Sequence, residues 1–381
     1  MNTFTVYSVF DIEISTAKGS TLWDTHGAAY LDLYGGHAVI SIGHSHPHYV
    51  NAITKQLQSI GFYSNSIKIP AQEKLAKKLG KLSGYHDHQL FLCNSGAEAN
   101  ENALKLASFH NGRKKVISFT GAFHGRTSLA VAATDNQTIV APVNETTNIC
   151  LLPFNDVAGL QAAMDDSVCA VIIEGVQGVG GVVIPTIPFL KEAEALCRKF
   201  GAVLILDEVQ SGYGRTGKFF AHQHAGIQPH IITVAKGMGN GFPIGGVLIT
   251  PEIQAKKEML GTTFGGNYLA CAAALAVLEV IESEQLIKSA HDMGRYLTAH
   301  LQGIPHIKEI RALGLMVGIE LDQNCAAVRN ELLFTHHIFT GSASNKNTIR
   351  ILPSLSITKA EIDFFISAFK QTLESIKKET V

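Results

Sequence analysis

The sequence lacks an excess of charge of either sign. Its 31 Lys and Arg residues are matched by 32 Asp and Glu residues, so the formal net charge over 381 residues is −1. A protein that binds nucleic acid or an anionic membrane surface carries a basic footprint, which this balance does not provide. Charged residues make up only 17% of the chain and hydrophobic residues 46%, a composition that excludes disorder. We therefore predict a folded protein with neither nucleic acid nor a membrane as partner.

The sequence also lacks long apolar runs, paired cysteines and a targeting segment. No run reaches the roughly 18 apolar residues that a membrane-spanning helix needs. Residues 1–5 show neither the basic nor the apolar region of a secretory signal. The six cysteines are far apart and form no Cys-x-x-Cys pair, which is typical of a reduced protein. We expect a cytoplasmic location.

Short apolar runs alternate with helical patterns through the middle of the chain. The runs are partly β-branched and fit strands covered on both faces, at residues 90–92, 116–119, 170–173, 203–206, 231–235 and 247–250. Helical periodicity lies between them, for example at residues 98–109 and 188–200. This alternation predicts an α/β domain with a mostly parallel sheet.

The two ends of the chain have a different pattern. Residues 20–33 alternate around a Gly turn, as a hairpin does, and a helix is expected at 47–59. A long Ala-rich helix follows Gly266, then a strand pattern at 310–322 and a last helix at 359–378. We predict a large cofactor-binding domain at 51–265 and a small α+β domain at 266–381, which the N-terminal segment 1–50 joins.

Two segments could bind an anion and a cation at strand ends. Residues 94–99 (NSGAEA) follow a strand and open a helix, where free N–H groups and small residues can hold a phosphate. The alternative is an ordinary Ser95 cap. Asp207 ends a buried strand and could pair with a cationic ligand group or a metal. The alternative is a carboxylate that caps a nearby loop.

Two further segments could supply an amine and a ring-stacking group. Lys236 lies between a strand and a Gly-rich turn, where desolvation lowers the pKa of an amine and allows it to react with a carbonyl. Phe123 offers a ring face and Arg126 a fork for a carboxylate. The alternatives are a solvated Lys, and a core Phe beside a surface Arg. Together the four segments match the needs of pyridoxal phosphate: a Lys for the aldehyde, an acid for the ring nitrogen, a phosphate cup and a stacking partner.

Five ordered segments resemble the motifs of class III aminotransferases, the fold type I, subgroup II enzymes that depend on pyridoxal phosphate. The resemblance is greatest to acetylornithine aminotransferases and extends over about residues 14–353. The segments are NSGAEANENALKLA, FHGRT, LDEVQSGYGRTGKFFA, AKGMGNGFPIGG and TTFGGNYLACAAALA. The resemblance implies a fold type I transferase and a homodimer with shared active sites. It also implies transfer of an amino group from an N-acylornithine to 2-oxoglutarate, in arginine biosynthesis.

The resemblance also implies a role for each matching position. Lys236 would hold the cofactor and later move a substrate proton, while Asp207 would pair with the ring nitrogen. The remaining cofactor contacts would come from Ser95, Gly96 and Ala97 at the phosphate, Phe123 and Val209 on the ring faces, Gln210 at the ring hydroxyl, and Thr263 reaching the phosphate across the dimer. Thr262 would lie near the substrate, Arg126 would bind the α-carboxylate of the acylornithine, and Arg350 would bind that of glutamate.

The sequence departs from these motifs at one position. Relatives commonly have Glu-Pro-x-Gln-Gly-Glu where residues 174–179 are EGVQGV, so Val179 replaces the second Glu. In related enzymes that Glu pairs with the glutamate-binding Arg while the ω-amino donor is bound. Arg350 therefore needs another masking group, or the donor differs. The sequence does not decide whether the donor carries an N-acetyl or an N-succinyl group.

Three other functions remain alternatives. They are an ornithine or 4-aminobutyrate aminotransferase, an isomerase of the glutamate-1-semialdehyde aminomutase type, and a catalytically silent protein that binds pyridoxal phosphate. Two separate carboxylate clamps, Arg126 and Arg350, favour transamination over isomerisation. The retained Lys236 and Asp207 argue against a silent protein.

Two patterns suggest other ligands but lack the residues to bind them. Residues 212–217 fit the dinucleotide-binding spacing G-x-G-x-x-G, yet no acid follows between Glu208 and Glu252 to bind a ribose. Among the histidines at positions 44, 46, 48, 86 and 88, only His44 and His48 are four residues apart, and Pro47 between them breaks the helix that a helical metal site would need. We expect turn and cap roles for them and no metal.

Overall fold

The structure is a computed structural model that describes residues 1–379, with side-chain surroundings given up to residue 375. Its helices are α1 (Gly35–Ala38), α2 (Pro47–Ser59), α3 (Pro70–Ser83), α4 (Gly96–Asn111), α5 (Ser128–Ala132), α6 (Val157–Ala163), α7 (Ile187–Phe200), α8 (Tyr268–Ser283), α9 (Leu286–Leu301), α10 (Ala326–Phe334) and α11 (Lys359–Glu379), with 3₁₀ turns η1 (Gln137–Ile139), η2 (Pro142–Asn144), η3 (Ala221–His224) and η4 (Lys236–Met238). Its strands are β1 (Ile14–Lys18), β2 (Thr21–Asp24), β3 (Ala29–Asp32), β4 (Gln89–Cys93), β5 (Lys115–Phe119), β6 (Ile149–Leu152), β7 (Val168–Glu174), β8 (Val203–Asp207), β9 (Ile231–Val234), β10 (Gly245–Ile249), β11 (Ile307–Leu313), β12 (Met316–Leu321), β13 (Ile338–Phe339), β14 (Gly341–Ser342) and β15 (Thr348–Ile351).

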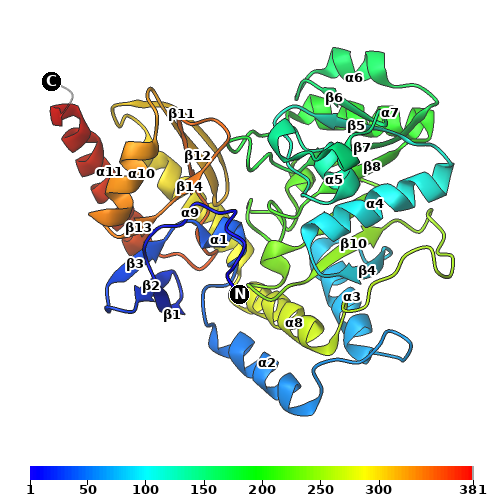
Figure 1. Ribbon diagram of the computed structural model, residues 1–381, viewed down its shortest axis with the longest axis horizontal. Coiled ribbons are helices and arrows are strands. Elements are labelled where there is room, and N and C mark those ends of the chain that lie inside the picture. The colour runs from blue at the N-terminus through cyan, green and yellow to red at the C-terminus, as the bar shows by residue number, and fades with distance from the viewer. Residues whose placement is uncertain (380–381) are drawn as a thin grey trace.

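A seven-stranded sheet forms the centre of the larger part of the molecule, on the right in Figure 1. Its strand order is β4-β10-β9-β8-β7-β5-β6. The five strands β9, β8, β7, β5 and β6 are parallel to one another, whereas β10 is antiparallel to both β4 and β9. The predicted α/β class with a mostly parallel sheet is therefore confirmed.

Both faces of this sheet are covered by helices, which explains its nearly continuous apolar strands. On β8, Val203 and Ile205 belong to the core that α4 covers, and Leu204 and Leu206 belong to the core that α6 and α7 cover. The pleat sends alternate side chains to opposite faces, so every residue of such a strand is buried.

The smaller part contains two four-stranded sheets, with orders β1-β2-β3-β13 and β11-β12-β15-β14. Strand β13 is parallel to β3, so residues from both ends of the chain share one sheet. The strand pattern expected at 310–322 is divided between β11 and β12, which form an antiparallel hairpin. Gly314 makes this turn with a φ of 56°, and a Cβ there would lie 2.5 Å from the carbonyl carbon of Thr216.

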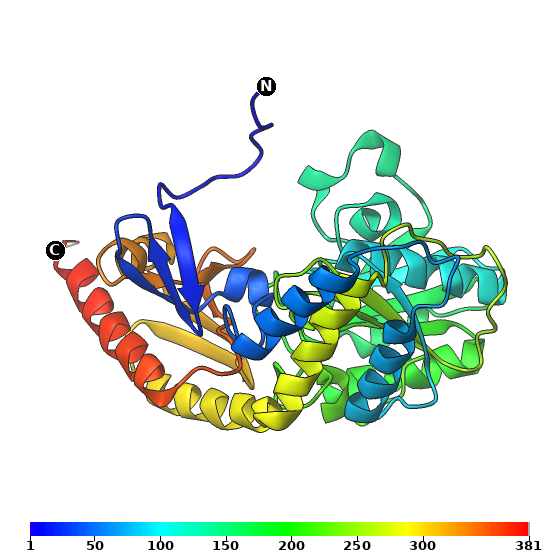
Figure 2. The ribbon, with the colours of Figure 1, turned by 90° about the horizontal axis from the view of Figure 1, so that it is seen from below.

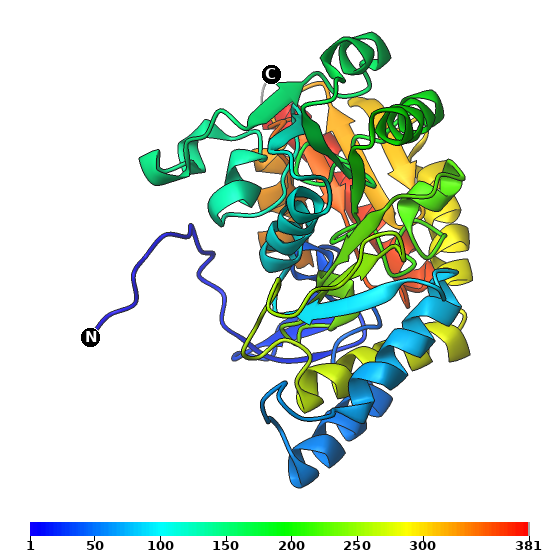
Figure 3. The same ribbon diagram turned by 90° about the vertical axis from the view of Figure 1, so that its right-hand side faces the viewer.

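Helix α8 connects the two parts, and α2 and α3 pack along it (Figure 2). The first residues of the chain form an extended arm that projects away from the body (Figures 2 and 3). No helix in the described residues is long and apolar enough to cross a membrane.

Candidate active site

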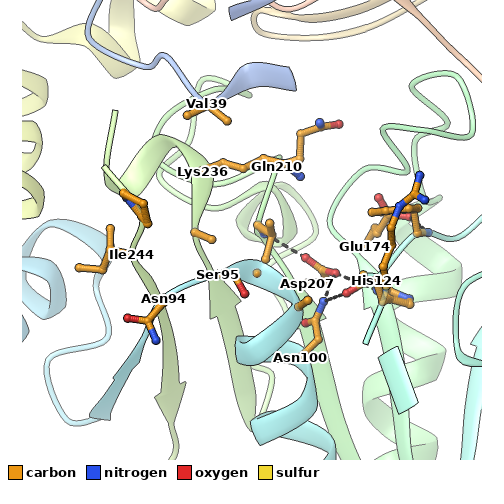
Figure 4. A pocket seen from close by; sticks show the side chains of 18 of the residues that line it. Val39, Asn94, Ser95, Asn100, His124, Glu174, Asp207, Gln210, Lys236 and Ile244 are labelled. Atoms are coloured by element: carbon orange, nitrogen blue, oxygen red, sulfur yellow. Dashed lines mark hydrogen bonds and ion pairs between the residues drawn. The ribbon is translucent and has the colours of Figure 1, made fainter. Parts of the chain in front are cut away.

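A cavity of about 410 Å³ lies at the carboxyl ends of β8 and β9 (Figure 4). Ligands of α/β proteins bind at this end of the strands because loops and helix N-termini converge there. The cavity brings together most of the residues that the sequence predicted: Ser95, Gly96, Ala97, Phe123, Arg126, Asp207, Val209, Gln210 and Lys236.

The N-terminus of α4 forms one wall of the cavity. Ser95 caps this helix, and its hydroxyl accepts a hydrogen bond from the N–H of Glu98 at 3.2 Å. Gly96 and Ala97 belong to the first turn, whose N–H groups have no acceptor within the helix. A Cβ on Gly96 would lie only 2.6 Å from Cγ1 of Val209, so glycine allows this close approach. The wall therefore offers free N–H groups and the positive end of a helix dipole to an anion.

Asp207 ends β8 and is 4% exposed. Its Oδ2 accepts hydrogen bonds from Nδ1 of His124 and Nδ2 of Asn100, both at 2.8 Å, and its Oδ1 accepts one from the N–H of Val209 at 3.0 Å. These three donors fix the position of the carboxyl group in the cavity.

The sequence interpretation gave no role to His124 or Asn100. Both lie inside the quoted motifs, His124 beside Phe123 and Asn100 one helical turn after Gly96. That spacing was the available signal, because residues i and i+4 share a face of a helix.

Lys236 begins the turn η4, separated from the end of β9 by one residue, and has a φ of 41°. Burial lowers the pKa of its amine, and the carboxylates of Asp207 and Glu174 act in the opposite direction. A positive φ is strained for a side-chain-bearing residue and is typical of functional positions. The strained turn places the amine in the cavity, where its lowered pKa favours a neutral, reactive form.

Glu174 is a second acid of the cavity that the sequence interpretation did not assign. Its Oε1 accepts a hydrogen bond from the N–H of Phe123 at 2.9 Å, and its Oε2 accepts one from the N–H of Gly178 at 3.1 Å. Burial raises its pKa to about 7. Glu174 thus fixes the loop that presents Phe123, and it can exchange a proton near neutral pH.

Gln210 presents an unpaired acceptor. Its Nε2 donates to the carbonyl of His37 at 3.0 Å, whereas its buried Oε1 has no partner in the described part of the chain. A Cβ on Gly178 would lie 1.6 Å from this oxygen, so Gly178 leaves room for it. The oxygen is open to a hydroxyl donor on a ligand.

Three predicted residues lie outside the lining of the cavity. Arg350, on β15 in the smaller part of the molecule, is 3% exposed, and its charge lowers the pKa of Lys236. Thr262 accepts a hydrogen bond from Nδ2 of Asn94, which does line the cavity, at 3.2 Å. Thr263 is exposed and does not line the cavity of its own chain. Arg126 is also exposed, at the cavity edge.

The lining fits the cofactor that the sequence suggested. An anion site on α4, the carboxylate of Asp207, the amine of Lys236 and the open oxygen of Gln210 lie in one cavity. They correspond to the phosphate, ring nitrogen, aldehyde and ring hydroxyl of pyridoxal phosphate.

Comparisons with known proteins agree with this assignment. A family model described as aminotransferase class-III matches residues 5–373. The acetylornithine aminotransferases of Methanothermobacter thermautotrophicus and Bacillus subtilis are each 40% identical to this chain. These alignments cover 97% of this chain in both cases, and 96% and 97% of the two relatives.

A solved structure has the same fold. The ornithine aminotransferase of Toxoplasma gondii is 29% identical, with a TM-score of 0.91 over 99% of this chain and 93% of its own. That structure contains pyridoxal phosphate at partial occupancy in its active site.

Proposed function

The chain belongs to the class III aminotransferases, which use pyridoxal phosphate, and we propose that it transfers the terminal amino group of an N-acylornithine to 2-oxoglutarate. Glutamate and a semialdehyde would be the products, in arginine biosynthesis. The observation that carries the proposal is one cavity holding Lys236, Asp207 and the N-terminus of α4, with two arginines in reach of it. N-acetylornithine is the first donor to test, because two relatives that match almost the whole chain are acetylornithine aminotransferases.

Each part of the cofactor has a counterpart among these side chains. The N–H groups of Gly96 and Ala97 would hold the phosphate, and Phe123 and Val209 would contact the two ring faces. Gln210 would accept the ring hydroxyl, and Asp207 would keep the ring nitrogen protonated. The bound ring supplies an electron sink for the electron pair left when a proton leaves the substrate carbon.

Lys236 would act as the base that moves this proton. Burial lowers the pKa of its amine, so the neutral form needed to take up a proton is more populated than for an exposed lysine. Asp207 cannot take this role, because three donors hold its carboxylate in place. The roles of base and ring partner are therefore separated by environment.

Two guanidinium groups would orient the substrates. Arg126 is exposed at the cavity edge and is free to meet the α-carboxylate of an acylornithine. Arg350 is buried, and its positive charge helps to lower the pKa of Lys236. It would bind the α-carboxylate of glutamate or 2-oxoglutarate, and its planar fork suits such a bidentate contact.

A half-reaction titration tests the donor. The cofactor-loaded protein is mixed with N-acetylornithine, N-succinylornithine, ornithine or 4-aminobutyrate, and the visible absorbance of the bound cofactor is followed. We expect one acylornithine to remove this absorbance and 2-oxoglutarate to restore it. A response to 4-aminobutyrate or free ornithine alone would overturn the acylornithine assignment.

The variant Arg350→Ala tests the acceptor. It should slow the glutamate half-reaction by about 10²-fold, because a charged, bidentate contact is lost. The acylornithine half-reaction should change much less. Equal losses in both half-reactions would contradict the assignment of Arg350.

We further propose a homodimer, because large apolar side chains are exposed together on one surface region. Large side chains are exposed on α2, on the loop after it and on the loop before α8: Val50, Leu57, Ile60, Phe62, Tyr63, Ile67 and Phe264. The rings of Phe62 and Phe264 join the two loops, with centroids 5.3 Å apart. A patch of this kind marks a protein–protein interface. Thr263 lies next to Phe264 within it, as expected for a residue that serves the other active site.

Sedimentation measures this assembly directly. We expect twice the 41.0 kDa mass of the chain, and Phe264→Asp should shift the protein towards monomers with weaker cofactor binding. A monomeric wild type with full activity would overturn the shared-site proposal.

The cytoplasm is the proposed location, since all six cysteines are free thiols.

A further inference from the structure

Arg350 is a buried cation whose partners in the described residues are all neutral. Its Nε donates to the carbonyl of Ser342, and its Nη2 donates to the hydroxyl of Tyr34 at 3.4 Å. Its Nη1 is buried and has no partner in the same part of the chain. Burial of an unpaired charge is unfavourable, so an open N–H at this depth indicates a place for a bound anion.

Tyr34 is packed tightly against this guanidinium. The guanidinium carbon lies 5.7 Å from the centre of the Tyr34 ring, within the range of a cation–π contact. The ring also packs against β14, where a Cβ on Gly341 would lie 2.5 Å from Cε2 of Tyr34. Gly341 pairs with Arg350 across the sheet, so the same strand pair positions both the ring and the cation.

The segment after Tyr34 is a left-handed turn. Gly35, Gly36, His37 and Ala38 have consecutive φ values of 55°, 54°, 69° and 63°. Left-handed conformation is unfavourable for residues with a Cβ and persists only where the surroundings impose it. Here it brings His37 back over Tyr34, so that Nδ1 of His37 and the hydroxyl of Tyr34 form a hydrogen bond. Their ring centroids are 4.7 Å apart.

The direction of these hydrogen bonds follows from the donors. A guanidinium only donates, so the hydroxyl of Tyr34 accepts from Arg350 and gives its own proton to Nδ1 of His37. Nδ1 can accept only if His37 is neutral with its proton on Nε2. Partial desolvation, Arg350 and Lys236 all lower the pKa of His37, which favours the neutral imidazole although its ring is partly exposed. Burial raises the pKa of Tyr34, which keeps the phenol neutral.

We propose that Tyr34 and His37 are positioning residues for Arg350. The phenol and the imidazole form a neutral relay that fixes the guanidinium for a substrate carboxylate without competing for it, whereas an acidic partner would compete. Val179 leaves this place free of an acid: its carbonyl accepts from the N–H of Ser344 at 2.8 Å, two residues from the carbonyl that binds Arg350. The turn also fixes Gln210 through the carbonyl of His37. The inference rests on the proposed function only in taking a dicarboxylate as the ligand of Arg350.

Binding of glutarate to the cofactor-loaded enzyme, measured by calorimetry, tests the relay without turnover. Glutarate has two carboxylates and no amine or keto group, so it reports on the clamp and not on the donor. Tyr34→Phe keeps the ring and removes the hydroxyl, and it should weaken glutarate binding about three- to tenfold. Tyr30→Phe is the matched control: its hydroxyl contacts Asp24, and binding should not change.

The results of the glutarate experiment distinguish an error in the relay from an error in the acylornithine assignment. Unchanged or tighter glutarate binding in Tyr34→Phe would overturn the relay, as would a wild type that does not bind glutarate. An error in the acylornithine assignment would leave these results unaffected, because no amino donor is present.

A pair of variants at position 179 tests the competition argument and does not disturb the turn. Val179→Glu should weaken glutarate binding at least about tenfold, because it would introduce a competing acid into the cavity lining, on a residue whose carbonyl binds Ser344 close to the carbonyl that binds Arg350. Val179→Gln has the same length and no charge, and should bind glutarate nearly as the wild type does. Equal weakening by both variants would indicate a steric effect and overturn the proposal.

The protonation state of His37 gives an independent readout. Nitrogen NMR of histidine-labelled enzyme, assigned with His37→Asn, should show a neutral ring with its proton on Nε2 at pH 7. A proton on Nδ1 at that pH would reverse the relay and overturn it, even if Tyr34→Phe failed to fold.

Discussion

Gly96 offers the most direct test of how the cavity is built. It is the first residue of α4, its φ is not positive, and alanine at such a position would ordinarily stabilise the helix by about 0.4–1 kcal/mol. A Cβ there, however, would lie 2.6 Å from Cγ1 and 3.1 Å from Cγ2 of Val209, well inside the ordinary contact distance of 3.4–4 Å. Overpacking of this kind costs about 1–3 kcal/mol. We therefore expect the net effect of Gly96→Ala to be unfavourable.

The damage should appear mainly in cofactor binding. Val209 lines the cavity, so the simplest relief of the clash moves its side chain towards the cofactor ring. The dissociation constant of pyridoxal phosphate, measured by titration of the apo-protein, should rise about tenfold, which corresponds to about 1.4 kcal/mol. Gly261→Ala is the control, since a Cβ at position 261 meets nothing within 4 Å and φ is not positive there.

A double variant identifies the cause. Val209→Ala removes both methyl groups that a Cβ on Gly96 would meet, so Gly96→Ala should be almost harmless when made in that background. The two changes should therefore be non-additive by about 1–2 kcal/mol. Additivity within about 0.5 kcal/mol, or unchanged cofactor binding in Gly96→Ala, would refute the steric argument.

Three other predictions use different observations. Lys236→Ala should slow both half-reactions by at least about 10²-fold in stopped-flow measurements, because the amine that lines the cavity is lost. Burial raises the pKa of Glu174 from about 4.5 to about 7, so the apo-protein should lose about 3 kcal/mol of stability as pH rises between these values. Melting temperatures of Glu174→Gln should lack this dependence, and a wild-type profile that rises over the same range would contradict the argument. Tyr85→Phe should lower the melting temperature, at a cost of about 1–3 kcal/mol, and leave both half-reactions unchanged, because the buried Nε2 of His222 loses a 2.6 Å partner remote from the cavity.

Local patterns predicted the elements of the larger sheet because both of its faces are buried. Continuous apolar runs of three to five residues identify such strands, and helical periodicity identifies the elements between them. Strand β6 was missed, since its residues are only half-buried at the edge of the sheet. The reversed direction of β10 was also not predictable, because the apolar pattern of a strand is the same in both directions.

The residues of the candidate site were predictable where they lie within short sequence motifs, and their contacts between motifs were not. The resemblance assigned Lys236 and Asp207 to the cofactor, and the structure places both in one cavity. The supports of these residues were missed, since a hydrogen bond such as that from His124 to Asp207 joins positions 83 residues apart. The relay of Tyr34 and His37 also depends on backbone conformation, because only the left-handed turn brings the two rings together.

Contacts between distant residues also explain the Gly-rich segment, residues 212–217, whose spacing resembles a dinucleotide-binding loop. Its Arg215 is 2% exposed and donates to the carbonyls of Leu315 at 3.2 Å, Pro353 at 2.7 Å and Ile40 at 3.5 Å. These carbonyls belong to three segments that are distant in the sequence, and two of them lie close to the residues of the relay. Ile40 follows the left-handed turn that carries His37, and Pro353 is three residues after Arg350. The segment after β8, which continues from Asp207, therefore binds the backbone that carries Arg350. This buried guanidinium links the segment after Asp207 to the backbone near Arg350 and His37, and no spacing within a single motif could have revealed the link.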